Sequence, residues 1–212
     1  MKNIYFFTFL ILFLHLTSKI SAQSEKQADA VVDKLLNTME REAFSADFML
    51  EIKDKSMPQT ITGNFTMKGH KFKLQSDEFV VFFDGKTQWV YMEEAEEVSI
   101  FEPDEKEINE INPMAMLADF KAESTVRYAT KTSTNNVYYV EMVSKNLRSD
   151  IEKVELGLNK SNDNIVHINQ YSRNGGTMSL HLENLKRGIT ASDNVFVFDR
   201  SKYPNVEIND LR

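Results

Sequence analysis

From Phe44 onward, apolar and polar residues alternate with a period of two along one segment after another. In residues 44–53 apolar side chains occupy every second position, and residues 60–68 repeat the pattern. Such alternation is typical of antiparallel strands that have one face on the core and one in water. A sheet of this kind has to cover its apolar face with another layer, so the chain is restricted to a layered, β-rich fold.

Further short segments of strand character follow, separated by turn-forming residues. Asp84-Gly85 is the clearest turn, because it tolerates the positive φ that a tight hairpin requires. The predicted strands are residues 44–53, 60–68, 71–75, 79–83, 87–92, 98–101, 125–130, 137–143, 151–158, 165–171, 177–185 and 195–198. No linker and no repeat of fixed period interrupts them, so we expect residues 23–212 to form a single domain.

Two segments have helical character. In residues 24–41 apolar side chains recur at the spacing of one helical face, and Ser24 with Gln27 makes a capping box. A second, short helix is expected where Asn112 can act as cap and Pro113 as the first helical residue. The pattern therefore predicts an α+β fold: a long antiparallel sheet, curved or nearly closed, with helices against its apolar face.

The first 22 residues have the features of a secretory signal peptide. Lys2 supplies the positive start, residues 4–16 are almost entirely apolar, and Ser21-Ala22 provide small residues for cleavage. As a helix the apolar run would span about 20 Å, short of the roughly 30 Å hydrocarbon core of a membrane. The chain contains no Cys. An exported chain without disulfides fits a bacterial periplasm.

The charge balance excludes several classes of partner. The chain has 25 Lys and Arg against 32 Asp and Glu. Loss of the signal removes Lys2 and Lys19, which leaves 23 against 32 and a net charge of −9. Nucleic acids and anionic membrane surfaces both require clustered basic residues, so neither is an expected partner.

No pattern typical of a catalytic or metal site is evident. His70, His167 and His181 lack the spacing of a zinc site, and there is no phosphate-binding loop or nucleophile elbow. We therefore expect no cofactor, no metal and no enzymatic activity. A hydrolase that uses a pair of the many carboxylates is the alternative that composition leaves open.

The chain has more apolar residues than a sheet with one solvent-exposed face needs. Residues 79–83 are apolar at consecutive positions, as if both faces were covered there, and the mature chain is rich in Phe and Met. Such residues either fill an ordinary core or line a cavity for an apolar ligand. Met suits a cavity because it repacks around variable shapes, and a short Met-rich helix suits a movable lid.

Three stretches carry a resemblance to a known family. They are the run from Asp84 to Tyr91 (DGKTQWVY) with the strand pair before it, Pro113-Met114 with Leu117, and the ending from Phe196 to Ile208. Together they resemble the LolA family of periplasmic lipoprotein carriers. The resemblance implies an incomplete antiparallel barrel with a lid of short helices. Its cavity would shield the acyl chains of lipoproteins on their way to the outer membrane.

Family membership would also imply a monomer that needs no cofactor, receives lipoproteins from an inner-membrane donor and delivers them to an outer-membrane acceptor. One departure concerns the lid. The family's best-known members carry an Arg just after the Lys that Lys68 resembles, and this Arg ties the lid shut. Here Gly69-His70 follow, so the family's way of closing the lid does not carry over to this chain from the resemblance.

The alternation places one set of side chains toward the helices. The expected cavity residues are Phe48, Leu50, Phe65, Met67, Phe72, Leu74, Phe79, Val81, Phe83, Trp89 and Tyr91, and the expected lid residues are Met114, Met116, Leu117 and Phe120. Trp89 fluorescence is then expected to respond to lipid binding. Two other functions stay open: a carrier or sensor of another lipid or apolar ligand, and a non-catalytic interaction module of the envelope with a filled core.

Overall fold

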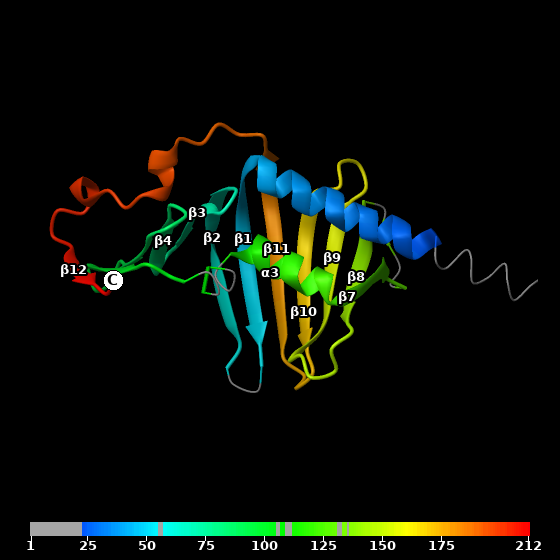
Figure 1. The fold of residues 1–212 in the computed structure, drawn as a ribbon. Coiled ribbons are helices and arrows are strands. Elements are labelled where there is room, and N and C mark those ends of the chain that lie inside the picture. The colour runs from blue at the N-terminus through cyan, green and yellow to red at the C-terminus, as the bar shows by residue number, and fades with distance from the viewer. Residues whose placement is uncertain (1–22, 55–56, 105–106, 109–111, 131–132, 135) are drawn as a thin grey trace, which may run out of the picture.

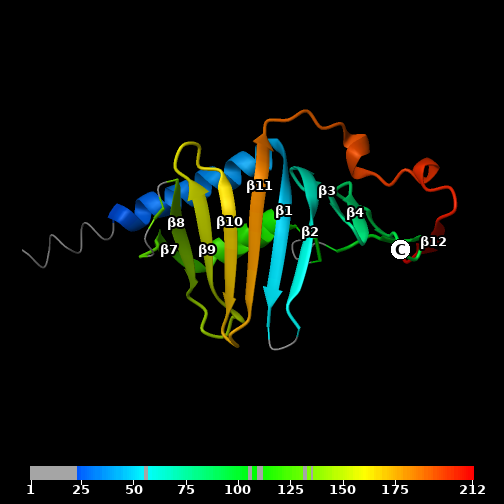
Figure 2. The ribbon, with the colours of Figure 1, turned by 180° about the vertical axis from the view of Figure 1, so that it is seen from behind.

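The protein is a curved sheet with helices on one of its faces (Figure 1). The computed structural model describes residues 23–54, 57–104, 107–108, 112–130, 133–134 and 136–212. In the reverse view the sheet lies in front of the blue and the green helix, so these helices cover a single face (Figure 2). The predicted signal peptide, residues 1–22, lies outside the described residues. Within the described ranges, no helix has the length and apolar character needed to cross a membrane.

The described residues include twelve strands in one sheet. Their bounds are β1 (Ala43–Lys53), β2 (Gln59–Lys68), β3 (Lys71–Ser76), β4 (Phe79–Phe83), β5 (Gln88–Met92), β6 (Glu97–Phe101), β7 (Ser124–Tyr128), β8 (Val137–Ser144), β9 (Ile151–Asn159), β10 (Ile165–Ser172), β11 (Thr177–Arg187) and β12 (Glu207–Asp210). The order across the sheet is β12-β6-β5-β4-β3-β2-β1-β11-β10-β9-β8-β7. In the part of the chain that is described, the outer strands β12 and β7 do not pair with each other, so the barrel is incomplete.

Strand β1 shows how the alternation builds this sheet. Phe44 lies opposite Met67 of β2, and Leu50 lies opposite Leu180 of β11. Residues opposite each other in an antiparallel pair share a face, so apolar side chains from distant parts of the sequence meet on one side. The predicted α+β fold, an open antiparallel barrel with a helical cover, is confirmed.

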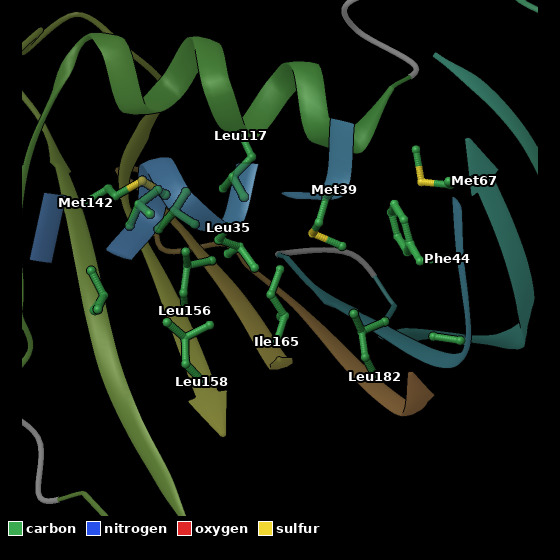
Figure 3. Close-up of a cluster of buried hydrophobic side chains, with 14 of the residues drawn as sticks. Leu35, Met39, Phe44, Met67, Leu117, Met142, Leu156, Leu158, Ile165 and Leu182 are labelled. Atoms are coloured by element: carbon green, nitrogen blue, oxygen red, sulfur yellow. The ribbon is translucent and has the colours of Figure 1, made fainter. Parts of the chain in front are cut away.

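The N-terminal helix, residues 23–41, covers the upper part of this face. Its apolar stripe, Ala28, Val32, Leu35 and Met39, is buried as the 3.6-residue period predicts. Figure 3 shows Leu35 and Met39 pointing into a cluster with the sheet residues Leu156, Ile165 and Leu182.

The short helix α3 (Pro113–Ala122) crosses the same face beside the N-terminal helix (Figure 1). Asn112 caps it, because its side-chain oxygen accepts hydrogen bonds from the backbone N–H groups of Met114 at 2.9 Å and Ala115 at 3.3 Å. Pro113 occupies the first turn, where a missing N–H costs nothing. The predicted cap and helix start are therefore correct.

The C-terminal segment corrects one expectation. Residues 195–198 were expected as a strand, but they belong to no strand. Val195 and Phe196 end the 3-10 helix η1 (Asp193–Phe196), and Val197 and Phe198 follow it. After a second 3-10 helix, η2 (Arg200–Lys202), the chain adds β12 parallel to the edge strand β6. In this apolar run, Phe198 packs against Phe82 of β4 instead of extending the sheet. The edge of β6 is paired by β12.

Candidate functional site

A cavity lies between the sheet and α3, with a volume of about 350 Å³. This is the lower end of the range, about 300–1,000 Å³, in which small-molecule sites fall. Its walls are almost entirely apolar. The lining residues are Met39, Phe44, Phe48, Leu50, Phe65, Met67, Phe72, Leu74, Met114, Met116, Leu117, Phe120, Ile151, Val154, Ile168, Gln170, Met178, Leu180 and Leu182.

The structure places ten of the fifteen expected site residues in this lining. On the sheet they are Phe48, Leu50, Phe65, Met67, Phe72 and Leu74, and on α3 they are Met114, Met116, Leu117 and Phe120. The pairings Met67 with Phe72 and Phe65 with Leu74 put residues of β2 and β3 on the face of β1 that the helices cover. Alternation within each strand is sufficient to identify them.

Three further expected residues face the same side but do not reach the cavity. Val81 lies opposite Leu74 and Phe83 lies opposite Phe72, with ring centroids of Phe72 and Phe83 5.5 Å apart. Phe83 is fully buried, and Phe79 shares its face. Phe83 and Val81 therefore extend the hydrophobic core beyond the residues that line the cavity.

The expectation that Trp89 and Tyr91 face the helices is wrong. Trp89 pairs with Phe82 and Tyr91 pairs with Val80, whereas Phe83 pairs with Gln88. The loop after Asp84 sets this register, and a shift of one residue moves every side chain of a strand to the other face. Trp89 and Tyr91 therefore lie on the outer face of the sheet, away from the cavity.

The C-terminal segment covers this outer aromatic group. The Phe198 ring lies 5.9 Å from Phe82 and 6.4 Å from Tyr91, and Tyr203 lies 4.5 Å from Tyr91. Phe198 and Tyr203 stack on each other at 4.9 Å. Here the apolar excess of β4 has its explanation, because one face packs on the core and the other packs beneath the C-terminal segment.

The sequence analysis missed a second wall of the cavity. It consists of residues from the N-terminal helix, from the start of β1 and from β9, β10 and β11: Met39, Phe44, Ile151, Val154, Ile168, Gln170, Met178, Leu180 and Leu182. The signal was present, since Met178, Leu180 and Leu182 alternate in the same way as Phe48 and Leu50. What alternation alone lacked was the pairing of β1 with β11, which brings the two ends of the chain together.

Helix α3 is held at its C-terminal end by Lys121. The Lys121 ammonium lies 2.7 Å from Asp33 and 3.0 Å from Asp29, both on the N-terminal helix. Burial lowers the pKa of Lys121, but hydrogen bonds to Asp33 and Asp29 outweigh it, so the pKa lies above its ordinary value. This contact ties one helix of the cover to the other.

The residues that flank the turn at Gly69-His70 contact the C-terminal segment and not the lid. Lys68 and Lys71, on either side of it, both donate to Asp193 at 2.9 and 2.8 Å. These hydrogen bonds lower the pKa of the Asp193 carboxyl from 3.8 to about 2. The turn therefore anchors the C-terminal segment, whereas the lid contact is made by Lys121.

Two histidines lie together on the side of the sheet away from the cavity. On the outer face of β10 and β11, His167 Nδ1 and His181 Nδ1 lie 2.9 Å apart. Among the residues that the structure describes, no three His, Asp or Glu side chains lie together in a way that could hold a metal ion.

Comparison with known proteins decides the family. Residues 18–170 match the family model described as outer membrane lipoprotein carrier protein LolA. The chain belongs to the LolA family. It is also 25% identical over 183 residues to the outer-membrane lipoprotein carrier protein of Idiomarina loihiensis, a match that covers 84% of each chain.

A solved structure with a similar fold is known as well. An uncharacterized conserved protein from Thermus thermophilus superposes with a TM-score of 0.56, covering 87% of this chain and 99% of that one, at 9% sequence identity. At this identity the likeness concerns the fold alone.

Proposed function

We propose that this protein is a periplasmic carrier that binds the acyl chains of lipoproteins in its cavity and conveys them to the outer membrane. The observation that carries the proposal is the lining of the cavity, in which Gln170 is the one polar residue among nineteen. A space of this kind, roofed by a short helix, suits hydrocarbon chains. It does not suit an interaction module with a filled core.

The energetics fit a carrier. Each methylene that leaves water for an apolar site gains about 0.8 kcal/mol, so an acylated anchor cannot cross an aqueous compartment unprotected. A carrier must also release its cargo, which requires that its cover opens reversibly. The cover here is α3, whose ten residues are too few for a stable isolated helix and depend on packing.

The remaining parts of the proposal follow from membership of a carrier family. Residues 1–22 would be a cleaved signal that directs the chain to the periplasm, and residues 23–212 would form one carrier domain. Its partners would be acylated lipoproteins, an inner-membrane donor and an outer-membrane acceptor. The protein would act as a monomer without catalysis or cofactor.

Binding of a synthetic triacylated lipopeptide, compared with the same peptide without acyl chains, tests the proposal by calorimetry. We expect one-to-one binding of the acylated peptide only. Leu50→Trp should abolish binding, because Leu50 lines the cavity and a larger side chain fills it. The matched control is Met49→Trp. Met49 directly precedes Leu50 in β1 and lies on the outer face of the sheet, where it is exposed.

The outcome distinguishes the alternatives. Binding of free fatty acid or phospholipid without binding of the lipopeptide would identify a carrier of another lipid. Absence of any acyl binding would contradict the proposal.

A further inference from the structure

Exposure along the cavity wall shows where the cavity opens. Phe44, Phe48 and Leu182, at the end of the sheet beneath the N-terminal helix, are buried. Toward the other end, Leu50 and Leu180 are only half-buried although they line the same cavity. The opening therefore lies at the edge where β1 ends, β10 ends and β11 begins, drawn at the bottom of Figure 1.

The polar residue of the lining stands at this opening. Gln170 is half-buried and lies two residues before the end of β10, between Val154 of β9 and Met178 of β11. Within the described part of the chain, no hydrogen bond engages its side-chain amide. Its amide is not among the buried polar atoms that lack a partner, so it faces water at the opening. A ligand can take the place of that water, and this group therefore has capacity for a hydrogen bond to a ligand.

The chemistry of the lining restricts what that ligand group can be. Among the described lining residues there is no Lys, Arg, Asp or Glu, so a phosphate or carboxylate would find no counter-charge inside. A neutral amide donates well to a carbonyl oxygen. The ester and amide carbonyls at the head of acyl chains meet this condition, and the charged or bulky remainder of the ligand would stay in water outside the opening.

We propose that Gln170 binds the ester or amide carbonyl at the head of the acyl chains, so that the ligand enters with its chain ends toward Phe44 and its head at the edge of β10 and β11. This inference rests on the proposed function and specifies its ligand: acyl lipids over ether lipids or hydrocarbons of equal length. Gln170 acts as a specificity-determining residue, and the apolar walls supply affinity without discrimination.

A matched pair of lipids tests this. 1,2-Dipalmitoylglycerol has two ester carbonyls, and 1,2-dihexadecylglycerol has ether oxygens and chains of the same length. Their affinities can be measured by displacement of diphenylhexatriene, a fluorescent hydrocarbon with no polar group. One neutral hydrogen bond corresponds to a preference for the ester of about 3- to 10-fold.

The test variant is Gln170→Met, which keeps the length of the side chain and removes the amide. We expect its affinities for ester and ether to be equal, with that for the ether unchanged. The matched control is Gln75→Met, because Gln75 is exposed on β3 and does not line the cavity; it should retain the preference. Equal binding by the wild type, or a preference that survives in Gln170→Met, would overturn the inference alone. Binding of neither lipid by the wild type would overturn the proposed function with it.

Discussion

Lys121 Nζ, at the end of α3, donates a hydrogen bond of 2.7 Å to Asp33 Oδ1 on the N-terminal helix. The Lys121 side chain is only 17% exposed, whereas Asp33 is about half exposed. The bond fixes the C-terminal end of α3, and the residues nearer its start, Met114 and Met116, carry no such link in the described structure. We predict that the cover pivots about Lys121 and opens from its Asn112 end.

Replacing Lys121 by Met should loosen this cover. The lost ion pair is partly exposed and worth about 1 kcal/mol, which corresponds to a roughly five-fold increase in opening of α3. Hydrogen exchange of residues 113–122 should accelerate by that factor. Lys34→Ala is the control, because it breaks the exposed bridge between Lys34 of the N-terminal helix and Asp163, which lies between β9 and β10, without touching α3. Equal acceleration in both variants would contradict the pivot.

Substitutions at the two central residues of α3 should affect ligand affinity and the free energy of unfolding to different extents. Both line the cavity. Met116 is 41% exposed, whereas Leu117 is 6% exposed and also belongs to the buried core. Met116→Ser is therefore expected to weaken acyl binding at a stability cost below about 1 kcal/mol. Leu117→Ser should lower the free energy of unfolding by about 2–5 kcal/mol. Thermal unfolding and lipid titration of each variant measure both effects, and the reverse ranking would refute this division.

The fluorescence of Trp89 should not change when a ligand binds. It lies on the outer face with Phe82, so acyl chains in the cavity do not change its surroundings. Its fluorescence should stay constant at saturating ligand, whereas a tryptophan introduced as Phe65→Trp in the cavity should respond. A response of Trp89 in the wild type with none at position 65 would contradict the assigned strand register.

The attachment of the C-terminal segment should weaken at low pH. The folded-state pKa of Asp193 is about 2 against an ordinary 3.8, so its bonds to Lys68 and Lys71 stabilise the segment above about pH 4. That contribution falls as the pH drops through the folded value. A carboxyl NMR titration should give a midpoint near 2, and Lys68→Met with Lys71→Met should return it toward 3.8. An unchanged midpoint in the double variant would contradict these contacts.

The local sequence pattern was enough to predict the structure around a residue when that structure depends only on its own strand or helix. The alternation around Phe48 and the cap at Asn112 each gave the correct element, and the former also gave the correct face. The closing contact of the lid required more, because Lys121 and Asp33 meet only once both helices rest on the sheet.

The alternation of apolar and polar residues could not predict features that depend on strand register or on pairing between strands far apart in the sequence. The face of Trp89 depends on a loop that places Gln88, rather than Trp89, opposite Phe83. The wall formed by Leu180 and Gln170 depends on β11 pairing with β1, 130 positions apart at Leu50 and Leu180. An apolar run such as residues 195–198 has the same composition whether it extends a sheet or covers one.

Identification of the molecule bound in the cavity tests the account most directly. The protein would be purified under native conditions from the cells that produce it and examined by mass spectrometry, together with Leu50→Trp and Met49→Trp. We predict one acylated lipoprotein per chain in the wild type and in Met49→Trp, and none in Leu50→Trp. A wild type without any acyl-bearing molecule, or the same amount in all three proteins, would contradict the claim that this cavity carries acyl chains.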